Sequence, residues 1–330
     1  MAGQLWSSAA DGGYMYADEL SKWLRFQLQP LCYFRQLCDP DDQTTKGLHR
    51  GASAVWNVYG DVADIGNDLA ETEEMPETSF TIAQRSLTVT EYGISVPYTG
   101  KLEMLAEHDL KSVIDKTLLL AAQKYFDYKA FTQFDAALYT AAPTSGNSTT
   151  AITTTEDGTC ATANNLAMGK THVALMLDFL RENNVPPFRG SYYGAISHPS
   201  TWRAFKDDLE SIHQYTESGM AHIFEGERGK YEGCKFIDQT FIPKGGAADT
   251  TTFDARTGTA DAWNNALSSW AFFMGQDTVK EVIVVPEEVR AKIPTDFGRS
   301  KAIAVYYLGG FGLSHDDATN TRILKWDSSV

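Results

Sequence analysis

The chain has 330 residues and a formal net charge of −15 at pH 7, from 28 Lys and Arg against 43 Asp and Glu. This acidity argues against tight binding to a nucleic-acid backbone, because such binding needs basic side chains to displace the counterions of the phosphates. The longest apolar run, Ala302–Leu313, is too short to cross a bilayer. The length predicts about two hydrophobic cores, in two domains or in one domain with large excursions.

Residues 1–50 form an N-terminal arm that contains one predicted helix, Ala17–Leu28. Its apolar stripe consists of Leu20, Trp23, Leu24 and Leu28, and Pro30 ends the helix. A second apolar patch and a polar turn at 39–46 follow. The stripe has no partner nearby in the sequence, so we expect the arm to dock on the subunit body or on a neighbour. We also expect a chain that lacks residues 1–45 to fold but not to assemble.

Two segments with strand-like alternation, Ala52–Tyr59 and Leu87–Tyr98, are predicted to pair as the two sides of a hairpin. Pro97 and Gly100 end the second strand. Between the strands, residues 60–84 contain no Lys or Arg and seven acids, namely Asp61, Asp64, Asp68, Glu71, Glu73, Glu74 and Glu77.

This acidic loop is long enough to be functional rather than idle. One interpretation is a solvated tip that charge keeps soluble. The other is a contact that needs cations, either a divalent metal or basic side chains of a neighbour such as Arg181, Arg189 or Lys206. Because the calcium-loop spacing is absent, the sequence favours side chains over metal.

A long helix is predicted from Leu110 onward, over about thirty residues that form a rod of roughly 45 Å. No Pro or Gly interrupts it, and its predicted apolar face consists of Leu110, Val113, Ile114, Thr117, Leu118, Ala121, Tyr125, Tyr128 and Phe131. The charged residues of the helix, Asp127 among them, are expected to be solvated or paired three or four positions apart.

The C-terminal half reads as alternating helices and strands. Residues 140–164 are predicted to be a flexible linker, and Asn165 is predicted to cap a helix whose apolar face is Leu166, Val173, Met176, Leu177 and Leu180. The predicted strands that follow are Tyr192–Ser197, Cys234–Thr240, Ser269–Met274, Thr278–Val285, Ala302–Leu308 and Arg322–Trp326. The third and fourth of these are expected to form a hairpin around Gly275–Asp277.

No catalytic, cofactor-binding or metal-binding residue is predicted. His198 lies at a strand-to-helix junction, but no G-x-S-x-G nucleophile motif accompanies it, so a capping role is favoured. Gly309–Gly312 lacks the Lys-Ser/Thr of a phosphate loop and is interpreted as a strand-end turn. The four cysteines have no metal-ligand spacing and are expected to be free thiols, namely Cys32, Cys38, Cys160 and Cys234.

The order of parts resembles the major capsid protein of tailed bacteriophages, an α+β protein with the Hong Kong 97 type fold, in its podovirus-like branch. Three stretches carry the resemblance in addition to this order. They are Leu69–Glu77 before the alternating strand around Tyr92, Ile196–Pro199 before a helix, and Gly229–Ile237.

The resemblance implies an N-terminal arm (1–50), an extended loop (51–100), a peripheral domain with the spine helix (101–164), an axial domain (165–286) and closing strands of the peripheral domain (287–330). It also implies a structural protein that self-assembles, in the host cytoplasm, into the icosahedral shell of a virion around double-stranded DNA. Its expected partners are copies of itself in hexamers and pentamers, with scaffolding, portal and decoration proteins as further candidates. No cofactor, no sequence-specific DNA contact and no membrane are expected.

The residues expected to contact neighbouring subunits are Leu20, Trp23, Leu24, Leu28, Glu71, Glu73, Glu74 and Glu77. Some members of the family cross-link a Lys of the extended loop to an Asn of a neighbour, but no Lys occurs here between Lys46 and Lys101. Two other functions remain open: an encapsulin-type nanocompartment shell, and a soluble α/β hydrolase-like enzyme that uses His198 with an acid such as Asp207.

Overall fold

The computed structural model describes residues 31–43, 53–62, 80–158, 166–188, 192–213, 230–241, 268–294, 296–317 and 320–329, together with 66, 68, 69, 71, 74, 75 and 77–79. The predicted arm stripe (Leu20, Trp23, Leu24, Leu28), Glu73 and Cys160 lie outside the described residues.

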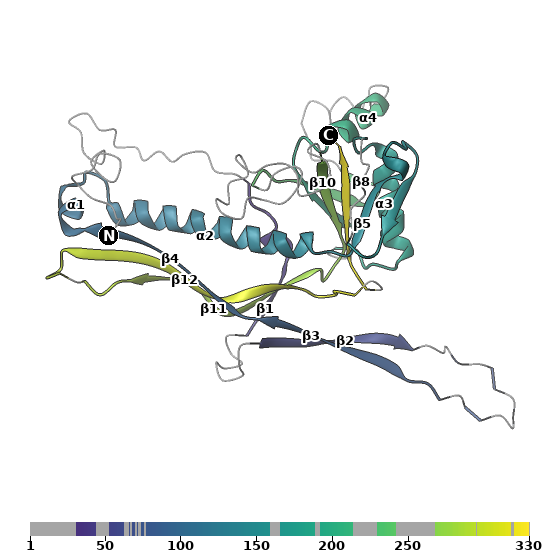
Figure 1. Ribbon diagram of the computed structural model, residues 1–330, viewed down its shortest axis with the longest axis horizontal. Coiled ribbons are helices and arrows are strands. Elements are labelled where there is room, and N and C mark those ends of the chain that lie inside the picture. Colours follow the sequence, from purple (N-terminus) through teal and green to yellow (C-terminus); the bar gives the residue numbers. More distant parts are fainter. Residues whose placement is uncertain are drawn as a thin grey trace.

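One long helix lies along a first sheet of four strands in the order β1-β11-β12-β4 (Figure 1). The strands are β1 (Asp39–Asp42), β11 (Val279–Ala291), β12 (Ser300–Leu313) and β4 (Thr90–Thr99). β1 runs parallel to β11, and the other neighbours are antiparallel. Pro97 lies inside β4, where it is tolerated because β4 is an edge strand of this sheet.

The helix α2 (Leu110–Asp135) has 26 residues and begins where the sequence predicts. Asp109 caps it, because its side chain accepts a hydrogen bond from the N–H of Lys111 at 3.2 Å. The buried face is Leu110, Ile114, Leu118, Ala122, Phe126, Asp127, Tyr128, Ala130, Phe131 and Phe134. The prediction that Asp127 is solvated or paired is therefore wrong: an N-terminal segment far away in the sequence covers it, with its backbone bonded to the carboxylate.

A second sheet of seven strands lies at one end of the long helix, in the order β6-β5-β13-β10-β7-β9-β8 (Figure 1). Its strands are β6 (Ile152–Thr155), β5 (Tyr139–Pro143), β13 (Ile323–Ser329), β10 (Ser268–Met274), β7 (Tyr193–Ser197), β9 (Cys234–Asp238) and β8 (Lys230–Tyr231). The helices α3 (Lys170–Glu182) and α4 (Arg203–His213) pack against it.

The molecule has two hydrophobic cores. One lies between α2, the first sheet and one face of the second sheet, and the other lies between the opposite face of the second sheet and the helices α3 and α4. Phe131 stacks on Trp270 of β10, with ring centroids 5.2 Å apart, so the helix reaches the second sheet directly. The core behind α3 contains the residues that its helical spacing predicts, namely Val173, Met176, Leu177 and Leu180. This helix starts at Lys170 rather than at Asn165, with Gly169 at its N-cap.

Three predictions about pairing are wrong. Residues 140–164 are not a linker over their described part, because β5 and β6 lie in the second sheet and β5 is buried throughout. β10 and β11 do not form a hairpin, because they belong to different sheets and the chain crosses between them at Gly275–Asp277. Ala52–Tyr59 pairs mainly with Phe80–Thr88 rather than with Leu87–Tyr98.

The strand pair β2 (Ser53–Val62) and β3 (Phe80–Thr88) is a separate two-stranded hairpin. It extends beyond the rest of the molecule on the side of the second sheet (Figure 1). At the opposite end lies the short helix α1 (Gly100–Leu105), which Thr99 caps by accepting a hydrogen bond from the N–H of Leu102. Among the described residues, no helix is both long and apolar enough to span a membrane.

Candidate subunit-contact surfaces

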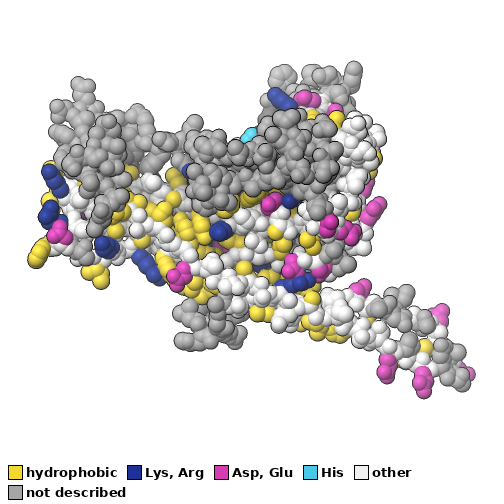
Figure 2. Space-filling model, in the orientation of Figure 1, with side chains coloured by type: hydrophobic (Ala, Val, Ile, Leu, Met, Phe, Trp, Pro, Cys, Tyr) yellow, Lys and Arg dark blue, Asp and Glu magenta, His cyan; other side chains and the backbone are white. Residues whose placement is uncertain are grey.

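The outer face of the β2–β3 hairpin is apolar and open. Tyr59 lies opposite Ile82 in the register, and its ring is 6.4 Å from that of Phe80. Tyr59 is 66% exposed and Phe80 is 56% exposed, and Val55 and Val62 are also exposed. Hydrophobic side chains are visible along the hairpin in Figure 2. Such a patch on a projecting element is typical of a surface that another molecule covers.

The inner face of the hairpin is fixed to the body at its root. The indole Nε1–H of Trp56 donates to the carbonyl of Ser314 at 3.2 Å. The guanidinium of Arg85 pairs with Asp316 at 2.5 Å and with Asp317 at 2.8 Å. All three acceptors lie in the segment that follows β12, so two polar attachments set the direction in which the hairpin leaves the body.

Two glycines of β12 give the root its close packing. A Cβ on Gly310 would lie 3.3 Å from the carbonyl of Thr88, and one on Gly312 would lie 3.3 Å from the side chain of Leu87. Residues 309–312 are therefore strand residues on which the hairpin rests, and the prediction of a strand-end turn there is wrong. A side chain at either position would require the hairpin to shift by a few tenths of an ångström, so the glycines allow this close approach.

The far end of the hairpin is acidic, and acidic side chains are visible there in Figure 2. Asp61, Asp68, Glu71, Glu74 and Glu77 are exposed and form no ion pair with another described residue. Of the cations that the sequence suggests as partners, Arg181 is engaged within the subunit and Lys206 is exposed on α4, whereas Arg189 lies outside the described residues.

A second exposed apolar patch lies at the opposite end of the molecule, where β11 turns into β12 beside α1 (Figure 1). Phe297 is fully exposed, at 106%, and Ile293 is 84% exposed. Met104, Leu105 and Val289 are exposed as well. Asp296, Phe297 and Gly298 all have positive φ, at 54°, 50° and 88°, so the turn that carries Phe297 is tight.

Two lysines accompany this patch. Lys101 and Lys292 are exposed, and neither forms an ion pair within the described part of the chain. The nearby Arg290 is paired with Glu288, and Glu103 is paired with both Lys111 and Lys301. Figure 2 shows several basic side chains at this end. The molecule thus has an apolar surface with acids at one end and an apolar surface with unpaired lysines at the other.

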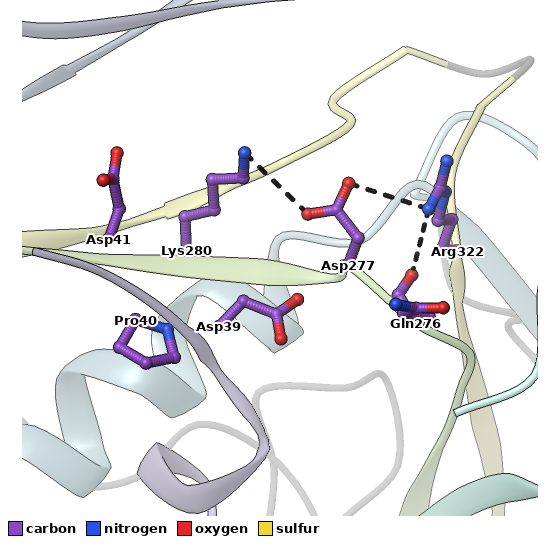
Figure 3. A pocket seen from close by; sticks show the side chains of 7 residues that line it. All are labelled: Asp39, Pro40, Asp41, Gln276, Asp277, Lys280 and Arg322. Carbon is purple, nitrogen blue, oxygen red and sulfur yellow. Dashed lines mark hydrogen bonds and ion pairs between the residues drawn. The ribbon is translucent and has the colours of Figure 1, made fainter. Parts of the chain in front are cut away.

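A pocket with a volume of about 650 Å³ lies where the two sheets meet (Figure 3). Both of its basic side chains lie near Asp277, which is 3.6 Å from Arg322 and 4.0 Å from Lys280. The hydrogen bond from His315, at 3.0 Å, is the main cause that lowers the pKa of Asp277 to about 2. The described residues contain no cluster of three or more His, Cys, Asp or Glu that is placed to hold a metal.

His198 has the local role that the sequence favours. Its Nδ1 lies 2.7 Å from the hydroxyl of Ser200 and 3.3 Å from the N–H of the same residue, which closes the turn after β7. Asp207 is exposed on α4, and neither residue lines the pocket in Figure 3. Cys32, Cys38 and Cys234 are free thiols, as predicted.

The fold was compared with known proteins. No protein-family model and no curated protein sequence matches the chain. Solved structures do match: the capsid asymmetric unit of cyanophage Pam1 has a TM-score of 0.66 at 12% identity over 95% of this chain and 96% of that chain. The acidic stable capsid structure of Helicobacter pylori bacteriophage KHP30 has a TM-score of 0.62 at 10% identity, over 98% of this chain and 97% of that chain. The capsid of Ralstonia phage GP4 has a TM-score of 0.61 at 12% identity, over 95% of this chain and 96% of that chain. The chain therefore has the mixed α+β fold of phage capsid chains, and the resemblance predicted from the sequence is confirmed at the level of the fold.

Proposed function

We propose that this protein is the major capsid protein of a tailed bacteriophage, a structural protein of the virion that self-assembles into an icosahedral shell around double-stranded DNA. One observation carries the proposal: the fold matches chains of several phage capsids over at least 95% of this chain and of each of those chains. The acidic composition supports it too, because a container must enclose the genome without gripping its phosphates.

The two exposed apolar ends suggest how copies associate. The outer face of the hairpin, with Tyr59, Phe80 and Ile82, would cover the patch of Ile293 and Phe297 on the next subunit. Because the two surfaces are different and lie at opposite ends of the molecule, this contact is head to tail. Head-to-tail contacts form closed rings when the rotation between copies closes, which is what pentamers and hexamers require.

Charge would set the register of this contact. The acids at the hairpin tip, Glu71, Glu73, Glu74 and Glu77 with their neighbours, would lie close to one another and need cations, since like charges at about 4 Å repel by roughly 1 kcal/mol even in water. The lysines of the opposite end, Lys101 and Lys292, are the cations that the described structure leaves unpaired beside an apolar patch. We therefore prefer them as partners to Arg181 and Lys206.

The sheets suggest a division into domains. We assign α2 and the first sheet to a peripheral domain, and the second sheet with α3 and α4 to an axial domain. Relative to the expected axial domain of residues 165–286, this assignment adds 139–155 and 323–329, whose strands pair with the second sheet. It also moves 279–286 to the peripheral domain, because these residues lie in β11 of the first sheet. In this arrangement the arm, through Leu20, Trp23, Leu24 and Leu28, docks on a neighbouring subunit, and scaffolding, portal and decoration proteins are the candidates for further partners.

Electron microscopy of the purified full-length chain tests the proposal. We expect closed icosahedral shells, and particles isolated from lysed host cells should contain double-stranded DNA that is protected from nuclease. A protein cargo in place of DNA would favour a nanocompartment. A chain that stays monomeric across concentrations, salt conditions and pH would contradict a shell function altogether.

A further inference from the structure

The segment that connects the arm to the body, Leu31–Asp42, is called the arm root here. It is bound tightly to the subunit. Phe34 is fully buried, with its ring centroid 5.5 Å from those of both Phe131 and Phe134. The N–H of Leu31 donates to the hydroxyl of Thr240 at 2.8 Å. The root also contains the 3-10 turn η2 (Arg35–Leu37) and β1. The described chain therefore begins at a segment that is fixed to the body.

A partly buried charge cluster anchors the root. The guanidinium of Arg35 pairs with Glu281 at 2.7 Å and also with Glu287. Its central carbon lies 4.5 Å from the ring centroid of Phe126, and the hydroxyl of Tyr307 donates to Glu281 at 3.0 Å. Glu281 is thus compensated twice, as a buried charge must be.

Asp127 is the exception in this cluster. Its side chain points from α2 into the interface with the root, and the residue is only 1% exposed. One carboxylate oxygen accepts a hydrogen bond from the N–H of Arg35 at 3.2 Å. The other oxygen, Oδ2, is buried and has no hydrogen-bond partner among the described residues. A carboxylate held in this way is poorly solvated when it is ionised and is better accommodated as the neutral acid.

The protonation of Asp127 accordingly changes near neutral pH. Burial raises its pKa from 3.8 to about 7, although the backbone N–H groups of Arg35 and Phe34 act in the opposite direction. Several other groups surround the interface. Burial raises the pKa of the Cys32 thiol to about 12. The charged and titratable groups from the root, α2, β11 and β12 are Cys32, Arg35, Cys38, Asp39, Lys124, Glu281, Glu287 and Tyr307.

We propose that Asp127 is a proton-controlled latch between the long helix and the arm root, which holds the root down as the neutral acid and loosens it as the carboxylate. The latch depends on contacts within one subunit, so it stands or falls independently of the proposed capsid function. Its consequence is that acid favours a root that is fixed to the body, and alkali favours a root that is freer to move.

The direction of the pH dependence follows from linkage. The pKa of Asp127 is higher when the root is docked than when it is lifted and the carboxyl is solvated, so the docked form binds a proton more tightly. The resulting stabilisation of the docked root is fully present below pH 3.8, decreases as the pH rises and is lost above about pH 7. Between those limits, docking weakens by about tenfold per pH unit.

Hydrogen exchange of the full-length protein tests the latch. The wild type is compared with Asp127→Asn, which keeps the acceptor for the N–H of Arg35 but does not titrate. For amides 34–38 we compare the opening equilibrium constant of the wild type with that of the variant at the same pH. We expect the ratio of wild type to variant to increase by about tenfold per pH unit between pH 5 and pH 7. The matched control Asp207→Asn, an exposed helical aspartate, should follow the wild type. Equal pH profiles for the wild type and Asp127→Asn would overturn the proposal.

A second measurement needs no variant at Asp127. Cys32 belongs to the root, whereas Cys234 is buried in the second sheet, and burial raises the pKa of both thiols. The thiolate fraction of each therefore increases equally with pH over this range. We expect the ratio of the alkylation rates, Cys32 over Cys234, to rise by at least tenfold between pH 5 and pH 7. A constant ratio would show that the root does not respond to protonation.

Discussion

The hairpin root and the arm root are both attached to the same body, but by different physical means. The hairpin is held at its surface, by the ion pairs of Arg85, one indole hydrogen bond and contacts with glycine backbone. The arm root is held from within, by Phe34 in the aromatic core and by Arg35 against Glu281. The first attachment can change its angle while the body stays folded. The second can move only by opening the core.

Truncation of the arm at two positions is expected to give the largest difference in subunit stability. Removal of residues 1–30 leaves the root intact, so we expect a folded subunit that fails to form shells. Removal of residues 1–45 also deletes Phe34, Arg35 and β1, and this should destabilise the subunit by roughly 5 kcal/mol or more. The expectation from sequence that the longer truncation folds normally is thus revised. Urea unfolding monitored by circular dichroism distinguishes the two chains.

Single aromatic substitutions separate folding from assembly. Phe34→Ala removes a fully buried ring and should lower the free energy of unfolding by about 3 to 5 kcal/mol. Phe80→Ala, on the open face of the hairpin, should change it by less than about 0.5 kcal/mol. It should instead raise the subunit concentration needed for shell formation at least tenfold, which corresponds to a loss of about 1.4 kcal/mol of association free energy. Normal assembly of Phe80→Ala would show that this face is not a subunit contact.

The hairpin root should respond to salt, and the arm root should not. Arg85→Ala removes partly exposed ion pairs and is expected to cost about 1 kcal/mol of subunit stability. It should nevertheless broaden the distribution of distances between spin labels on the hairpin and on α2. Salt at 1 M should broaden the same distribution in the wild type, because it screens the pairs. An unchanged distribution in both experiments would mean that the glycine contacts alone fix the hairpin.

The acidic tip should have the smallest effect, confined to assembled particles. Replacement of Glu71, Glu73, Glu74 and Glu77 by Ala should leave the unfolding of the subunit unchanged. If lysines of a neighbour pair with the tip, added salt weakens wild-type shells and a chelator has little effect. A metal clamp would give the opposite sensitivities, and light scattering of purified shells separates the two. A tip that affects neither assembly nor salt tolerance is only a solvated loop.

Local pattern in the sequence was enough to predict the long helices and most of the core strands, but not β1, β5 or β6, and not the partners of the strands. The spacing of apolar residues located α2 and the buried face of α3, because a helix is specified by residues three and four apart. The pairing of β10 could not be obtained in this way. Its residues 270–274 are all fully buried, and the strand lies between β13 and β7, which come from distant parts of the chain. A continuous apolar run does not indicate which strands lie on either side of it in the sheet.

The same limit applies to the site residues, since some can be recognised from local composition and others depend on distant segments of the chain. The acids of the hairpin tip could be recognised from composition, because no basic residue lies among them. Asp127 could not, because its burial depends on a segment 92 positions earlier in the chain. The patch of Ile293 and Phe297 was also missed. Its signal was present as two large apolar residues beside Pro294 and Gly298, which is an unusual composition for an exposed turn.

The turn that carries Phe297 has a consequence for the kinetics of association. Asp296 and Phe297 have positive φ, which is costly for residues other than glycine and persists only where the surrounding structure holds it, so the backbone that carries the ring has few alternative conformations. Little conformational entropy is then lost on docking, and the encounter does not have to wait for a loop to rearrange. In the proposed capsid, such an anchor would favour rapid and reversible capture, which would allow a misplaced subunit to leave a growing lattice and try again.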